Sequence, residues 1–461
     1  MRRAALLGST AVLLVGPTVL AFFSGGYFDG PRAVAGAVAW AIVLLLALVG
    51  SLPVPTGAAG RVALAGLVGL AAWSAASMAW TPLLGPALDN VQRLILYIGV
   101  LLAATALLRD RTASRAVEPV LALGALVAIA YGLSERLLPA LVDLGSMRSF
   151  GAGSRLEQPL TYWNAEGLLA AMGLVLCVRL AGDPVRPVVM RMAAAAACAP
   201  LGLGVYLSYS RGAVMAVVLG LTVLVAAAPT WTQLRAIAAG LGAGAVASAC
   251  ASLRDGVALL VGSQSQQQRH GAIMLVLLMA VGLGAALSCA RAVRAERRAS
   301  MRLGTLPLAS KLPAAAAVVA ALCVLGLAVG SSGDRAGGES AAGTPARFAS
   351  VNSVRYEYWR VGLQAFADEP VLGVGSGGFR VAWRLDRRVN LGVTEVHSLP
   401  LEVASELGLP GILFLGTFIA GVALAGRTAI RNRSPLAPGA CATLAAWLLH
   451  ASIDWDWQLP A

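Results

Sequence analysis

Charged residues are scarce in this 461-residue chain, at 12% of the sequence, while 58% of the residues are hydrophobic. A water-soluble fold needs charged residues on its surface, so this composition excludes an ordinary soluble globular protein. Lysine is almost absent, because Lys311 is the one lysine among 35 basic residues. The net charge of +13 comes from arginines that cluster in short loops between apolar runs. That pattern indicates membrane topology and excludes nucleic acid as a partner.

Cysteine is also sparse, and no Cys-x-x-Cys spacing occurs. The six cysteines fall inside or at the margins of apolar runs: Cys177, Cys198, Cys250, Cys289, Cys323 and Cys441. The sequence therefore predicts neither a disulfide framework nor a zinc site, and no other metal or cofactor is expected. Arg2 and Arg3 precede an apolar run that continues to Phe23, which is too long for the core of a signal peptide, so we expect a first spanning helix that is retained.

Long apolar runs dominate what is present. A helix needs about 20 apolar residues to cross the hydrocarbon core, and isolated strands cannot satisfy their backbone in lipid. Thirteen candidate spans follow, at 4–23, 33–50, 61–80, 92–108, 116–133, 161–180, 190–208, 212–228, 234–251, 271–290, 312–330, 409–426 and 437–453. The sequence thus predicts an all-α polytopic membrane protein, and its alanine- and glycine-rich spans predict closely packed helices.

The distribution of basic residues predicts the orientation. With the amino terminus in the cytoplasm, 19 of the 35 basic residues lie on the cytoplasmic side, and half of the other 16 lie in one long loop at 331–408. Long loops are poor indicators of topology, so the count favours a cytoplasmic amino terminus and an extracytoplasmic long loop in the plasma membrane. We divide the chain into N-terminal spans at 1–150, central spans at 151–330, the extracytoplasmic loop at 331–408 and C-terminal spans at 409–461.

Three polar regions share the outer side in this topology: the 134–160 loop, the SYSRG turn at 208–212 and the long loop. The centres of the spans contain almost no ionisable residues, whereas ion-coupled transporters usually place such residues near the midplane. The outer side is therefore where we expect any chemistry.

The long loop begins with a flexible linker at 331–350 and continues with a short amphipathic helix. We expect this helix to start after Asn352 or Ser353 and to lie on the membrane surface. One face of this helix would carry Arg355, Trp359, Gly362, Leu363 and Phe366. An arginine at such a place often reaches for lipid headgroups, so Arg355 alone does not indicate a binding site.

Two further segments of the loop are candidates for binding or catalysis. The GVGSGGF segment at 373–379 includes Gly375 and Gly377, whose backbone amides can approach an anion or a sugar, although an ordinary turn is the simpler interpretation. His397 precedes a helix that Ser398 can cap and Gly408 can end, and that helix carries Glu402. A neutral imidazole can act as a general base near pH 7, although a lone loop histidine is more often idle.

Arg211, in the SYSRG turn, starts a span at the outer interface. It is either an interfacial anchor or, if it faces inward, a bidentate ligand for a phosphate.

Taken together, four segments resemble the O-antigen ligase and polymerase superfamily of bacterial membrane glycosyltransferases. They are LTYWNAEG at 160–167, SYSRGAVMA at 208–216, the stretch from RYEYWRVGLQAF to PVLGVGSGGF at 355–379, and HSLPLEVASELGLPGILF at 397–414. Their order, before and within a large outer loop near the carboxy terminus, carries the resemblance. Ser398 departs from the asparagine that often follows the histidine in this superfamily.

The resemblance implies transfer of a glycan from undecaprenyl pyrophosphate to an acceptor hydroxyl on a glycan, lipid or protein, without a metal ion. It implies that Arg211 and Arg355 bind the pyrophosphate and that His397 activates the acceptor. Supporting roles fall to Glu402, Asn164, Gly375 and Gly377. Fixed arginine charge is physically suited to the leaving pyrophosphate, and an imidazole is suited to the attacking hydroxyl.

Two other kinds of function remain open at this point. One is a transporter of a small anion or a lipid-linked sugar, and the other is a membrane scaffold without catalytic activity. The transporter predicts ionisable residues or broken helices near the midplane, which the spans do not display, although glycine-rich spans can conceal breaks.

Overall fold

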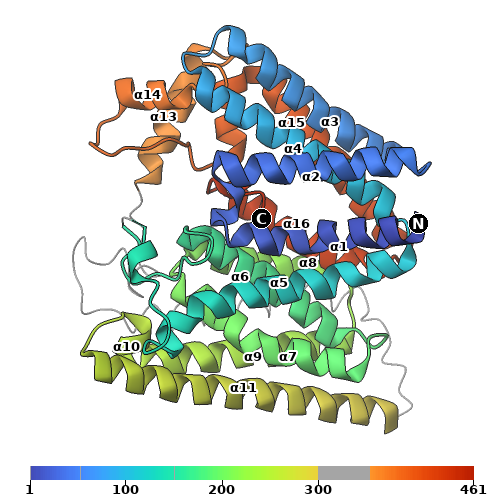
Figure 1. Ribbon diagram of the computed structural model, residues 1–461, viewed down its shortest axis with the longest axis vertical. Coiled ribbons are helices and arrows are strands. Elements are labelled where there is room, and N and C mark those ends of the chain that lie inside the picture. Colours follow the sequence, from blue (N-terminus) through green and yellow to red (C-terminus); the bar gives the residue numbers. More distant parts are fainter. Residues whose placement is uncertain (1, 52, 150, 299–353) are drawn as a thin grey trace. The chain divides into compact units, whose positions relative to one another are not determined.

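The computed structural model describes residues 2–51, 53–149, 151–298 and 354–461 (Figure 1). Every regular element in these ranges is a helix, and ten of the helices are long and apolar enough to cross a membrane. The all-helical membrane architecture is therefore confirmed. The predicted span at 312–330, the linker at 331–350, and Asn352, Ser353, Lys311 and Cys323 lie outside the described residues.

The predicted count of thirteen spans is not reproduced among the described residues. Helix α8, Arg211–Ala227, and helix α16, Ala437–Ala451, form where spans are expected, but with 17 and 15 residues they are shorter than the ten long helices. At 1.5 Å per residue, helices of this length cover less than the roughly 30 Å of a hydrocarbon core.

The chain forms two compact units, each built from segments that are distant in sequence. The first unit takes residues 1–116, 351–434 and 451–461. Its helices are α1 Arg2–Ala21, η1 Ser24–Gly26, α2 Asp29–Leu48, α3 Ala58–Ala76, η2 Ser77–Ala79, α4 Leu84–Leu107, α13 Arg355–Asp368, α14 Phe379–Asp386, α15 Leu399–Arg431 and η6 Asp456–Gln458.

The second unit takes residues 117–350 and 435–450. Besides α8 and α16 it contains most of α5 Arg111–Leu137, and η3 Gly145–Met147, α6 Trp163–Gly182, α7 Val188–Leu207, α9 Trp231–Ser252, α10 Asp255–Ala258 and α11 Gln264–Arg298. A continuous apolar core runs through it, and α6 is its most deeply buried span.

Glycines bring the helices together closely, as the composition predicts. A Cβ on Gly66 of α3 would lie 2.3 Å from the backbone nitrogen of Phe418 on α15, and one on Gly421 of α15 would lie 2.3 Å from that of Ala63. In the second unit, Gly202 of α7 packs directly on Gly244 of α9. Small residues allow such backbone contact, which stabilises helix pairs in lipid.

Helices α13 and α14 pack against each other and against α15 in the first unit (Figure 1). Helix α15 is broken at Gly408, whose φ of 61° and ψ of −157° are not helical, so the expected helix end at this glycine is confirmed. Ser398 is the N-cap residue of α15, but its side chain accepts no capping hydrogen bond. These elements form a small apolar core from Tyr358, Val361, Phe379, Trp383 and Val396.

The helix expected after residue 352 is present as α13, and the stripe that it buries in protein shares only Gly362 with the face predicted for the membrane surface. The buried stripe consists of Tyr358, Val361, Gly362 and Ala365, and Leu363 is 57% exposed. The stripe follows helical spacing, and Gly362 packs against Val396, so α13 uses its apolar face for protein packing. Periodicity alone does not distinguish a helix on a protein surface from one on a membrane surface.

Candidate functional site

His397 occupies the residue position just before the N-cap of α15, in a conformation that few non-glycine residues adopt. Its φ is +59°, a left-handed value that costs about 1 to 3 kcal/mol for a residue with a side chain. Its Nδ1 lies 3.0 Å from the backbone oxygen of Glu395. A carbonyl oxygen can only accept, so Nδ1 carries the hydrogen and Nε2 keeps its lone pair. The geometry therefore leaves Nε2 as the basic nitrogen.

Aromatic side chains surround the half-buried imidazole. The Tyr358 ring lies 5.0 Å from it and the Trp455 ring 6.3 Å, both between centroids, and Trp359 Nε1 donates to the backbone oxygen of His397 over 3.2 Å. Burial lowers the pKa of His397, the Asp454 carboxylate opposes this shift, and the Arg355 charge adds to it. The imidazole is therefore neutral near pH 7, as a general base must be.

Arg355, the first residue of α13, lies in this neighbourhood too. Its guanidinium forms an ion pair with Asp454 of the C-terminal segment, and the Arg355 side chain is 22% exposed. Asp454 is fully buried. The structure thus brings Arg355 and His397 together within the first unit, around the Asp454 carboxylate.

Arg211 belongs to the second unit, where it begins α8. The Ser210 hydroxyl caps this helix by accepting from the Ala213 amide over 3.3 Å. The Leu156 amide donates to the Leu207 oxygen over 2.8 Å, and Gly167 packs against Ser208. Two of the segments singled out in the sequence, LTYWNAEG and SYSRG, therefore lie against each other in this unit.

Asn164 lies in the first turn of α6, beside this contact. It is buried, and its Nδ2 donates to the Tyr162 hydroxyl over 2.8 Å. The guanidinium of Arg155 stacks over the Trp163 ring at 4.5 Å. Sequence reasoning missed Arg155, although an arginine four residues before Pro159, in a loop predicted to be extracytoplasmic, was a usable signal.

The glycine segment is a structural connection whose amides are already engaged. The Gly377 amide donates to Glu406 Oε2 over 2.8 Å, the Phe379 amide faces Oε1 at 3.3 Å, and the Gly375 amide donates to the Glu406 backbone oxygen over 2.9 Å. Gly375 and Gly377 have φ values of 87° and 73°. An added Cβ would approach Thr81 or Pro86 to 2.5 Å, so glycine is required at both positions.

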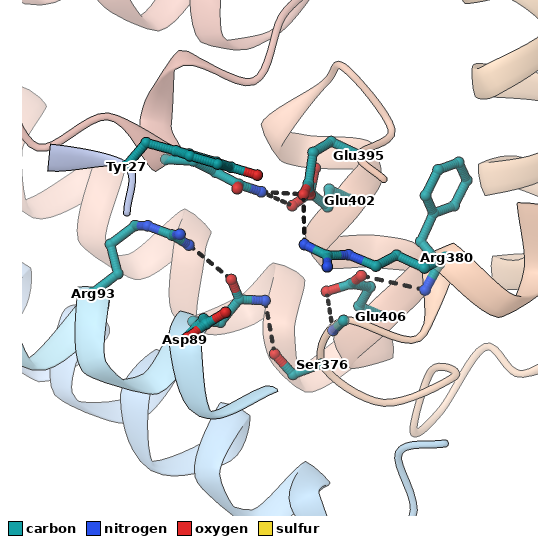
Figure 2. A network of polar contacts seen from close by, with 12 residues as sticks. Tyr27, Asp89, Arg93, Ser376, Arg380, Glu395, Glu402 and Glu406 are labelled. Atoms are coloured by element: carbon teal, nitrogen blue, oxygen red, sulfur yellow. Dashed lines mark hydrogen bonds and ion pairs between the residues drawn. The ribbon is translucent and has the colours of Figure 1, made fainter. Parts of the chain in front are cut away.

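Glu402 belongs to a buried polar network next to this segment (Figure 2). Gln458 Nε2 donates to Glu402 Oε1 over 3.1 Å and also to Glu395, while Arg380 reaches Glu395 over 3.0 Å. Arg93 donates to Asn90, which continues the network to Ser376. In Figure 2, α4 supplies Arg93 and the segment before α14 supplies Ser376.

Five polar residues of the site were not foreseen: Arg93, Arg380, Glu395 and Gln458 of this network, and Asp454, the partner of Arg355. A buried contact of Arg93 could have been predicted, because an arginine within a predicted span usually has a buried partner. The others lie in polar segments, where nothing in the sequence separates a buried charge from an exposed one.

The comparison with protein families supports the resemblance. Residues 257–416 match the family described as O-antigen ligase. This stretch includes Arg355, Gly375, Gly377, His397 and Glu402, whereas Asn164 and Arg211 precede it. No curated protein matches the chain.

Proposed function

Because residues 257–416 of this integral membrane protein belong to the O-antigen ligase family, we propose that it moves a glycan from undecaprenyl pyrophosphate to an acceptor hydroxyl. The reaction would take place on the extracytoplasmic side of the plasma membrane, in the assembly of cell-surface polysaccharide. The acceptor would be a glycan, a lipid or a protein. The arrangement of His397, Arg355 and Asp454 is the observation that carries the proposal.

In the proposed reaction, the acceptor oxygen attacks the anomeric carbon of the donor sugar. A new carbon–oxygen bond forms, the bond from that carbon to the pyrophosphate oxygen breaks, and the electron pair leaves with the lipid pyrophosphate. The acceptor proton moves to a base. The site has to remove that proton and to stabilise negative charge on the leaving group.

His397 is suited to the first task. Its Nδ1–H is committed to the Glu395 backbone, so Nε2 is the nitrogen that takes the proton. Burial keeps the ring neutral until it accepts that proton, and Asp454 stabilises the imidazolium that then forms.

The arginines are suited to the second task. Arg355 is partly exposed, and its ion pair with Asp454 fixes the guanidinium in place before the donor arrives. We assign Arg211, which begins α8 in the second unit, to pyrophosphate binding as well. Fixed guanidinium charge would replace a divalent ion, so we expect a chelator to leave the rate unchanged.

We assign the supporting residues to the architecture of the site. Gly375 and Gly377 allow the segment before α14 to pack closely on Thr81, which precedes α4, and on Pro86 of α4. Glu402 belongs to the buried network that holds the Glu395 side chain. Asn164 orients Tyr162 next to the Arg211 turn.

The test of the base uses purified protein in nanodiscs, a glycan on undecaprenyl pyrophosphate and a polysaccharide-repeat acceptor. His397→Gln should lower kcat by about 100- to 10,000-fold, the usual contribution of a general base. His270→Gln is the control, because His270 lies in the second unit, where its Nδ1 accepts from the Gly256 amide. Wild-type turnover by His397→Gln, with normal protein levels, would remove His397 from the mechanism.

The test of the arginines measures donor affinity. Arg355→Ala and Arg211→Ala should each raise the Kd for the lipid pyrophosphate, and Arg→Lys should restore only part, because lysine cannot bind two oxygens in a fork. Arg360→Ala is the control on α13, since Arg360 pairs with Glu357. Unchanged donor affinity in both alanine variants would contradict the assignment.

A further inference from the structure

The loop that leads to His397 changes abruptly from exposed to buried at Glu395. Residues 387–394 are exposed or half-buried, and the loop has no helical structure between Asp386 and Leu399. Glu395 is 5% exposed and Val396 is fully buried. The two residues directly before His397 are therefore buried, and they anchor the end of this loop.

The Glu395 side chain is held from two sides. Arg380 Nη2, on α14, donates to Oε1 over 3.0 Å, and Gln458 Nε2, from the C-terminal segment, donates to Oε2. Figure 2 shows Arg380 extending across the network to this carboxylate. The other hydrogen of the Gln458 amide goes to Glu402, so both donors of this group are used inside the network.

The backbone of the same residue determines the state of the imidazole. The Glu395 carbonyl oxygen accepts from His397 Nδ1, and His397 itself has the strained φ of +59°. A strained conformation persists only where its surroundings over-determine it. Here the determining contacts are the Glu395 anchor, the buried Val396 and the bond from Trp359 Nε1 to the His397 oxygen.

We infer that Glu395 is a positioning residue, whose anchored side chain fixes its own carbonyl and thereby holds His397 as the Nδ1–H tautomer with Nε2 available as the base. This inference rests on the proposed role of His397. Glu395 does not touch the substrates and acts through the histidine alone.

The charged and titratable groups that face the imidazole are Arg355 and Tyr358 of α13 and Asp454 of the C-terminal segment. None of them changes when Glu395 is replaced. Burial is the largest cause of the lowered pKa of His397, and its effect exceeds the opposite effect of the bond from Nδ1 to the Glu395 backbone. A loosened loop, which admits water, should therefore return that pKa toward its ordinary value.

The test compares Glu395→Gln with Glu357→Gln. Glu357 anchors the opposite end of the same loop, because it accepts from the Arg388 amide over 2.9 Å and pairs with Arg360. Glu395→Gln should lower kcat at least tenfold, leave the KM for the lipid donor within twofold, and move the acidic limb of the pH profile upward. Glu357→Gln should do none of these. Glu395→Asp should recover part of kcat.

A second measurement does not depend on catalysis. The chain has three histidines, so nitrogen-15 labelling of histidine gives three imidazoles, and His397→Gln identifies the signal of His397. The wild type should show the pure Nδ1–H tautomer, and Glu395→Gln a mixture of both tautomers. If Glu395→Gln fails to fold, Arg380→Gln removes the same ion pair from the other side and should shift the tautomers in the same direction.

Unchanged tautomer, kcat and acidic limb in the folded variants would overturn the inference, even if His397 proves to be the base. If His397→Gln is active while Glu395→Gln shifts the tautomers, the proposed function fails and the structural link between the two residues stands.

Discussion

At the scale of single residues, one backbone contact decides the chemistry of His397. Because a carbonyl oxygen accepts from Nδ1, the base is Nε2, and the carboxylate of Asp454 acts on the ring as a charge. Both effects come from residues that are not proposed to take the acceptor proton themselves. Such neighbours give an ordinary imidazole the protonation state that acceptor activation requires.

This environment predicts the pH dependence of the reaction. Burial lowers the pKa of His397 below its ordinary value of 6.5, and protonation removes the base, so kcat/KM should fall about tenfold per pH unit only below that pKa. The acidic midpoint of kcat/KM should therefore lie below pH 6.5. A midpoint at or above 6.5 would show that the ring is not desolvated in solution.

The Asp454→Asn variant tests the direction in which Asp454 shifts the pKa of His397. The Asp454 carboxylate raises the pKa of His397, so its removal should move the acidic midpoint further down. The KM for the donor should rise as well, because Arg355 loses its ion pair. An upward shift of the midpoint in this variant would contradict the assigned electrostatics.

At the scale of elements, helix α15 combines two tasks. Its first turns carry Glu402 and Glu406 into the buried network, and the helix beyond the break at Gly408 packs on α3 through glycines. The sequence predicts both parts and the break between them. It does not predict which glycines lie against a neighbouring helix, because a glycine facing lipid and one facing a backbone look alike in sequence.

Two glycines of α15 allow a matched test of this packing. A Cβ at Gly421 would meet the Ala63 backbone at 2.3 Å, whereas one at Gly416 meets nothing within 4 Å. Gly421→Leu should lower the free energy of unfolding by about 1 to 3 kcal/mol through overpacking. Gly416→Leu should leave it unchanged or raise it, because leucine favours the helix more than glycine does. Thermal unfolding in detergent measures both, and equal melting temperatures would contradict the close contact.

At the scale of the whole molecule, the two compact units are each assembled from distant stretches of the chain. Residues 257–416, which match the O-antigen ligase family, draw on both units. The first unit closes around its own C-terminal segment, since Tyr97 donates to the Trp457 oxygen over 2.5 Å and the Ala461 amide to the Gly25 oxygen over 3.1 Å.

The proposed orientation predicts that α15 begins on the extracytoplasmic side of the membrane and ends on the cytoplasmic side. Asn390 precedes this helix and Asn432 follows it, and both are exposed. In a protein without native cysteines, Asn390→Cys should react with a membrane-impermeant maleimide on intact cells. Asn432→Cys should react only after the membrane is permeabilised. The reverse pattern would place His397 in the cytoplasm and exclude the proposed reaction.

The sequence by itself determined that this is a helical membrane protein and where most of its spans lie, because hydropathy is a local property that lipid enforces on every segment. The ordered motifs also indicated the family. The tertiary structure alone decided that Asp454 pairs with Arg355 across 99 residues and that Gln458 joins Glu395 to Glu402. It also decided that Glu406 occupies the glycine-segment amides and that α13 packs on protein. These contacts join polar groups far apart in the chain, and a polar residue's own sequence context does not reveal its partner.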